Sequence, residues 1–238
     1  MKFIVSTIQE YEYIVARYTY HDDRALINKL YGKACKLANK VNPHSSGGLY
    51  RDKNTIINKL LGGLLTEYSV SELMKKGAKK YELEYEEINT SFIQDEELVK
   101  LGFNQIDLEL KINGKHVSIE IRSSFSYKTS VGRLFGYPLI NGKGAFSIIG
   151  WYTSSSKPKE IKKDYYIFGI HQYYPSKIRE MLNSTVEVII ASAVSKNTLE
   201  TEGYDSTLKQ NGAKFRVINP IKNSTPPLDG IKEILGLR

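Results

Sequence analysis

The stretch that most constrains the fold runs from Gln105 to Arg122 and predicts a single β-hairpin. Apolar and polar residues alternate on both sides of Asn113-Gly114, the pair that best tolerates the positive φ angles of a two-residue type I′ turn. Counting outward from the turn sets the pairing as Ile112 with Lys115, Leu110 with Val117, Leu108 with Ile119 and Ile106 with Ile121. Apolar residues then meet on one face, which supports this register.

The other face of the hairpin brings two acids together. The same counting places Asp107 opposite Glu120, with Arg122 diagonal to Asp107. Opposed residues have Cβ atoms roughly 4.5–5.5 Å apart, and like charges at that distance destabilise a sheet. A cation or a proton between the acids removes this cost, and a hard divalent metal is the natural cation for oxygen ligands. The alternative is an ordinary solvated face.

The same residues resemble a known signature. Asp107, separated by twelve residues from Glu120-Ile121-Arg122, resembles the motif of the PD-(D/E)XK nucleases. In that family one hairpin carries a metal-binding acid on its first strand and (D/E)-x-K on its second. Ile106 stands where the motif has proline, and Arg122 stands where it has lysine. The resemblance spans roughly residues 55 to 172.

The resemblance implies a metal site. Asp107 and Glu120 would hold Mg²⁺, with Mn²⁺ as a substitute and the Ile121 carbonyl as a further ligand. The family's helix before the core sheet often lends a glutamate to the metal, and GGLLTEYSVSELMKKG looks like that helix. Glu67 is the residue carried over, as a metal ligand or as the group that orients water. Glu72, on the opposite edge of the helix, is the alternative.

The replacement of the motif lysine by Arg122 has chemical consequences. Arginine stays protonated in proteins and cannot act as a general base. It can stabilise negative charge on phosphate oxygens, so it replaces the lysine if that lysine works through its charge. If the lysine must deprotonate water, another residue such as Lys128 has to act instead, or the chain is a relative that does not cut DNA. The predicted catalytic residues are therefore Glu67, Asp107, Glu120 and Arg122.

Composition limits the class of protein. The chain has 238 residues, 41% hydrophobic and 25% charged, which is ordinary for one large or two small soluble domains. No apolar run approaches the ~20 residues of a membrane span, and the N-terminal segment does not read as a signal peptide. The single cysteine, Cys35, has no internal disulfide partner, so a reducing cytoplasm is expected. A net charge of +8 favours a polyanionic partner.

Other chemistries find no support in the sequence. The four histidines show no zinc-ligand spacing; they are His21, His44, His116 and His171. The chain carries no P-loop, no G-x-G-x-x-G fingerprint and no G-x-S-x-G elbow.

The remaining pattern predicts alternating strands and helices. One helix is expected from caps at Asp22 and Asp23 to about Val41, with four lysines on or beside its polar side, either solvated or contacting phosphate: Lys29, Lys33, Lys36 and Lys40. A second helix is expected over about 55–76, capped by Asn54. Its Gly62-Gly63 pair costs about 1 kcal/mol per glycine and predicts close approach of another backbone.

Strands and shorter elements complete the prediction. Strands are expected over 3–8, 81–88, 145–152, 164–171, 185–194 and 214–219, a short acidic helix or loop over 94–102, and a helix over 175–183. The acids Glu84, Glu86 and Glu87 in this region are expected to be solvated.

These elements predict an α/β fold with a restriction-endonuclease-like core, a central mixed β-sheet flanked by helices. Residues 1–54 would be an N-terminal helical portion of the same domain, 55–194 the nuclease-like core, and 195–238 a C-terminal extension. The expected function is Mg²⁺-dependent hydrolysis of double-stranded DNA by a cytoplasmic type II restriction enzyme, a homodimer if it cuts both strands of a palindrome. The alternatives are a repair or junction nuclease, a DNA-binding relative that does not cleave, and a basic α/β domain with an incidental acid pair.

Overall fold

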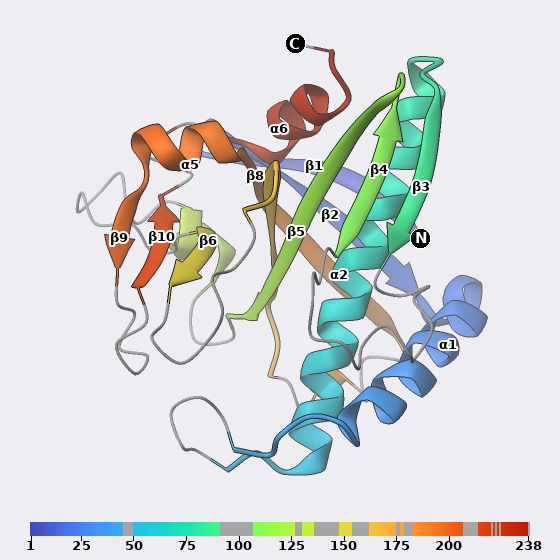
Figure 1. The fold of residues 1–238 in the computed structure, drawn as a ribbon. Helices are drawn as coiled ribbons and strands as arrows, with labels where there is room; N and C mark the ends of the chain where they lie inside the picture. The colour runs from blue at the N-terminus through green and yellow to red at the C-terminus, as the bar shows by residue number, and fades with distance from the viewer. Residues whose placement is uncertain are drawn as a thin grey trace.

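A seven-stranded mixed sheet organises the chain, in the order β1-β2-β8-β7-β5-β4-β3 (Figure 1). Its strands are β1 (Lys2–Ile8), β2 (Tyr11–Thr19), β3 (Tyr85–Thr90), β4 (Leu108–Ile112), β5 (Lys115–Phe125), β7 (Tyr165–His171) and β8 (Thr185–Ser195). Neighbouring strands are antiparallel except β5 and β7, which are parallel. A smaller antiparallel sheet has the order β6-β10-β9, with β6 (Ile148–Thr153), β9 (Tyr204–Ser206) and β10 (Lys214–Ile218).

These strands come from a computed structural model of the whole chain. It describes residues 1–44, 50–90, 107–126, 130–135, 148–153, 162–174, 177–178, 183–206, 214–219, 221, 223 and 225–237. The predicted helix or loop over 94–102 lies outside the described residues, as does most of the helix predicted over 175–183.

Helices cover one face of the large sheet. Helices α1 (Tyr20–Ala38) and α2 (Lys53–Lys80) run together beside it, and α6 (Pro227–Ile234) lies near the C-terminus (Figure 1). Val70 and Met74 of α2 share one buried cluster with Ile119 and Ile121 of β5 and with apolar residues of α6. Burial of these side chains, at about 25 cal/mol per Å² of apolar surface, holds α2 against the acid-bearing strand.

The opposite face is covered by the small sheet and by α5 (Lys196–Glu202) (Figure 1). Tyr166 and Phe168 of β7 share a second buried cluster with Ile148 of β6 and Leu199 of α5. Ile167, between them, belongs instead to the cluster on the α2 side, because strand residues alternate between faces. The expected α/β class, with a central mixed sheet flanked by helices, is confirmed.

The sequence reasoning missed two of the described strands, β2 and β9, and placed both helix caps wrongly. Strand β2 has buried residues on both faces, so it lacks the alternation that marks a half-exposed strand. Helix α1 begins after Thr19, whose N–H donates to Asp23 Oδ2 at 2.9 Å. Helix α2 is capped by Asp52, which accepts from the Thr55 N–H at 2.9 Å. Both helix starts were placed too late because several Asp and Asn residues there can cap.

The two adjacent glycines of α2 have different surroundings. A Cβ built on Gly62 would lie 2.6 Å from Phe125 Cζ and 3.2 Å from His171 Nε2, whereas one on Gly63 meets nothing within 4 Å. The Phe125 ring is itself stacked on His171, with ring centroids 4.9 Å apart. The close approach predicted for this pair therefore exists at Gly62 only, and it comes from side chains rather than from a backbone.

Matched alanine substitutions test this difference. Gly63→Ala should raise the free energy of unfolding by about 0.5–1 kcal/mol, because alanine costs less conformational entropy in a helix. Gly62→Ala should give no such gain and should destabilise the protein, because the methyl group displaces a stacked ring in a packed core. Urea denaturation of both variants measures this. Equal stabilisation by the two substitutions would contradict the packing at Gly62.

Candidate active site at the β4–β5 hairpin

The hairpin register is the predicted one. Asn113 and Gly114 have φ angles of 47° and 79°, as a type I′ turn requires. Leu108 pairs with Ile119, Leu110 with Val117 and Ile112 with Lys115. The predicted pair of Ile106 with Ile121 lies outside the described residues, since Ile106 is not among them.

Asp107 lies immediately before β4, and continuing the register by one residue from the Leu108–Ile119 pair would make Glu120 its partner. Its Oδ2 accepts a hydrogen bond of 2.7 Å from the Ile121 N–H. The Asp107 carboxylate is thus held against the backbone of β5. Because the N–H and C=O of one strand residue point to the same side, the Ile121 carbonyl is directed toward the Asp107 side of β5 as well.

Glu120 has a partner within its own strand. Arg122 Nη2 lies 3.3 Å from Glu120 Oε1, and the two side chains are only 22% and 15% exposed. We expected an uncompensated pair of Asp107 and Glu120, but the charge of Glu120 is balanced by an arginine two residues away. Asp107 is therefore the acid whose negative charge is unfavourable at this position.

The Asp107 carboxyl has an unusual affinity for protons. Burial, and after it the negative charge of Glu67, raise the pKa of Asp107 to about 7, against the opposing effects of the Ile121 N–H, Arg122 and Lys163. Two acids predicted from separate parts of the sequence, Glu67 on α2 and Asp107 on the hairpin, are thus close enough to interact. Perturbed carboxyls of this kind are common at functional sites.

Glu67 also faces a cation from α1. Burial lowers the pKa of Lys33, and the charge of Glu67 counteracts that effect. Lys33 is half-buried at the contact between α1 and α2, so it does not belong to a fully solvated face. Glu72, the alternative to Glu67, lies 3.3 Å from Lys75 instead. The structure therefore associates Glu67 rather than Glu72 with Asp107.

A second cation near Asp107 was not predicted. Lys163, two residues before the start of β7, is 3% exposed, and its charge lowers the pKa of Asp107. The sequence placed it in a basic loop and offered no signal that it is buried. Lys128, named as a substitute for the motif lysine, lies outside the described residues.

Glu87, which was expected to be solvated, is buried instead. Glu87 of β3 accepts hydrogen bonds from the hydroxyls of Ser71 and Tyr85, and Lys75 Nζ lies 3.0 Å from its Oε2. Its side chain is 10% exposed, so Glu87 is not solvated. These contacts join α2 to β3, so Glu87 has a structural role that explains the presence of an acid at this position.

The acids at the hairpin suit a hard cation by their donor chemistry. Asp107, Glu120 and the Ile121 carbonyl offer oxygen ligands, and a carboxyl with a raised pKa gains most from a cation beside it. Within the described ranges, no three His, Cys, Asp or Glu side chains are close enough to hold a metal together. Any ion held here would have at most two side-chain carboxylates from the described residues, a number that Mg²⁺ accepts because it keeps several waters.

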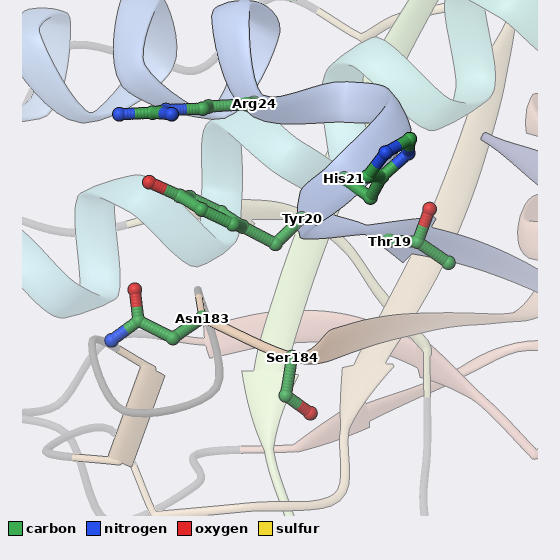
Figure 2. Close-up of a pocket in the computed structure, with 6 residues that line it drawn as sticks. All are labelled: Thr19, Tyr20, His21, Arg24, Asn183 and Ser184. Carbon is green, nitrogen blue, oxygen red and sulfur yellow. The ribbon is translucent and has the colours of Figure 1, made fainter.

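A pocket lies elsewhere, where β2 passes into α1 (Figure 2). It is about 530 Å³ in volume and is lined by Thr19, Tyr20, His21, Arg24, Asn183 and Ser184. The Arg24 guanidinium lies 5.4 Å from the centroid of the Tyr20 ring, and Figure 2 shows the two side chains stacked. The pocket shares no residue with the acid site, and its position at a helix start does not identify a ligand.

The raised pKa of Asp107 predicts a pH-dependent cost to stability. Between pH about 4 and 7 the folded protein holds a proton that the unfolded chain has lost, so this group lowers stability as pH rises through that window. Asp107→Asn removes the charge and keeps an oxygen to accept from Ile121. In metal-free buffer it should stabilise the protein by more than about 1 kcal/mol at pH 8, and by less at pH 5.

Urea denaturation at the two pH values measures the effect. Glu109→Gln is the matched control, because Glu109 is a β4 acid on the same face, 3.7 Å from His116. An Asp107→Asn gain that is equal at both pH values, or absent, would contradict the desolvated position of Asp107.

Comparison with known proteins adds one relative. No protein-family model and no solved structure matches the chain. The chain is 28% identical, over 239 aligned residues, to an uncharacterized protein of Methanocaldococcus jannaschii, with 90% of this chain and 83% of the relative covered. This likeness indicates no activity, so a function has to be argued from the residues themselves.

Proposed function

We propose that the chain is a Mg²⁺-dependent DNA endonuclease with a restriction-endonuclease-like core, most simply a type II restriction enzyme. One observation carries this proposal. The negative charge of Glu67, on the preceding helix, raises the pKa of Asp107, a partly buried carboxyl next to a hairpin of the predicted register. Continued by one residue, that register would pair Asp107 with Glu120, which supports a site made of the three acids that the family resemblance singled out.

Each residue of the proposed site has its own role in the reaction. Asp107, Glu120 and the Ile121 carbonyl would hold the cation. When bound, such an ion polarises the scissile phosphate and lowers the pKa of an attacking water. Glu67 would orient that water, a role supported by the effect of its charge on Asp107 from the helix layer. Arg122 presents a permanent positive charge for the phosphate oxygens.

The reaction is hydrolysis of a phosphodiester. The oxygen of water forms a new bond to phosphorus while one phosphorus–oxygen ester bond breaks. One proton of the water is lost, and one proton ends on the leaving oxygen, so no other reactant is consumed. The protein's contribution is position and charge, since negative charge develops on the phosphate oxygens.

Double-stranded DNA is the proposed substrate. A net charge of +8 supports binding to a polyanion. Among the helices of the described segments, none is long and apolar enough to cross a membrane. A homodimer that cuts both strands of a palindrome and a cytoplasmic location complete the proposal.

A relative that binds DNA without cutting it is the second candidate. The observation that favours it is the pair of Arg122 and Glu120, since an arginine stands at the motif lysine and contacts the second acid. A repair or junction nuclease is a near alternative that uses the same site. Substrate structure and cleavage pattern separate these functions.

Cleavage of plasmid and phage DNA tests the proposal directly. Purified protein with Mg²⁺ should convert DNA to discrete bands, and chelation by EDTA should abolish them. A smear would mean cleavage without sequence specificity. Asp107→Asn and Glu120→Gln should lose cleavage, because each removes a carboxylate ligand, while Glu109→Gln should cut like the wild type. Cleavage by Asp107→Asn at the wild-type rate would refute the assignment.

Substitutions of Arg122 test how its charge is used. Arg122→Lys should retain substantial cleavage, since either cation can stabilise charge on the phosphate. Arg122→Ala should lower the rate by about 10²–10³, the usual effect of removing one such donor. Single-turnover cleavage rates measure both. Tight DNA binding with no cleavage by the wild type would favour the non-cutting relative.

A further inference from the structure

Lys163 is a buried cation whose position the sequence did not reveal. It is 3% exposed, and lysine is almost never this buried unless a partner compensates its charge. Its neighbour Lys162 is exposed, with its Nζ 2.7 Å from Glu200 Oε1 and 4.4 Å from the centroid of the Trp151 ring. Two consecutive lysines therefore have opposite surroundings.

Hydrogen bonds fix the Lys163 backbone beside the acid-bearing strand. Asp164 Oδ2 accepts from the N–H and the hydroxyl of Ser118 at 2.8 and 2.7 Å, and the Asp164 N–H donates to the Ser118 carbonyl at 3.0 Å. The Lys163 N–H donates to the Tyr166 hydroxyl at 3.0 Å. Lys163 is thus attached next to Ser118, two residues before Glu120.

The register between β5 and β7 relates the position of Lys163 to that of Glu120. In the parallel β5–β7 pair, Tyr166 is the partner of Glu120. The Tyr166 side chain therefore connects the level of Glu120 with the backbone of Lys163. The electrostatic effect of Lys163 on Asp107 agrees with this geometry. A lysine on a four-carbon stem can direct its ammonium group from this anchor into the acid site.

We propose that Lys163 supplies, from the segment before β7, a second cation that acts on the substrate phosphate together with Arg122. This inference rests on the proposed nuclease function and names a further residue of the same site. Arg122 is already engaged with Glu120. A lysine ammonium is a compact charge with three rotatable donors, so it can contact a phosphate oxygen. Lys163 acts here through its charge, so no proton transfer is required of it.

Matched variants separate this role from general effects of charge. Lys163→Met removes a buried charge and keeps an unbranched apolar chain, and Lys162→Met removes the adjacent exposed charge. Single-turnover cleavage with Mg²⁺ should fall by about 10²–10³ in Lys163→Met and stay near the wild-type rate in Lys162→Met. Both variants should bind DNA equally well in the absence of Mg²⁺, because they lose the same net charge.

Metal titration without DNA gives a readout that does not depend on activity. Removing a cation from among acids favours a divalent ion, so Mn²⁺ should bind several-fold more tightly to Lys163→Met than to Lys162→Met. Electron paramagnetic resonance of free Mn²⁺ measures this. If Lys163→Met does not fold, as judged by circular dichroism, Lys163→Gln replaces it with the same expectations.

The outcomes distinguish this inference from the proposed function. If the wild type cuts DNA and Lys163→Met cuts as fast as Lys162→Met, Lys163 has no catalytic role and the nuclease proposal stands. Equal Mn²⁺ affinity in the two variants would likewise overturn the placement of Lys163 among the acids. If the wild type cuts no DNA under any of these conditions, the proposed function fails, and the catalytic role of Lys163 fails with it.

Discussion

The type I′ turn at Asn113-Gly114 is the constraint on which the rest of the site depends. A two-residue loop leaves one register for the hairpin, so it decides which residues of β4 and β5 are level. Asn113 also binds the third strand, because its N–H donates to the Glu84 carbonyl at 3.0 Å and its Oδ1 accepts from the Glu84 N–H at 3.1 Å. One residue with a left-handed backbone thus aligns β3, β4 and β5. A one-residue slip would turn Glu120 to the face that α2 covers.

Local patterns explain how much of this could be predicted. The hairpin register, the strands β7 and β8 and the existence of the two long helices follow from periodicity and turn chemistry, which act over a few residues. Lys163 could not be found in this way, because its burial depends on the pairing of β7 with β5. The Arg122–Glu120 contact was also missed, although alternation alone places both side chains on one face. The association of Glu67 with Asp107 was predicted only because a family resemblance supplied the long-range contact.

The arrangement of charge explains how the fold accommodates the acids Glu67, Asp107 and Glu120. Each acid has a cation near it from a different element: Lys33 of α1 by Glu67, Arg122 of β5 by Glu120, and Lys163 by Asp107. These cations reduce repulsion among the acids, but each also weakens the attraction of the site for a divalent ion. Asp107 remains the least compensated, since burial and Glu67 together raise its pKa to about 7. It is therefore the acid at which a metal ion would relieve the largest cost.

The position of Glu67 depends in turn on an uncharged contact deeper in the protein. His171, at the end of β7, lies with its Nε2 3.0 Å from the Gly62 carbonyl, and the Tyr173 hydroxyl lies 2.9 Å from its Nδ1. Burial lowers the pKa of His171 to about 4, so the ring is neutral at physiological pH. With a proton on Nε2, the ring donates to Gly62 and accepts from Tyr173, which satisfies both nitrogens. A neutral ring can thus fix α2 to β7 five residues before Glu67 without adding a further charge near the acids.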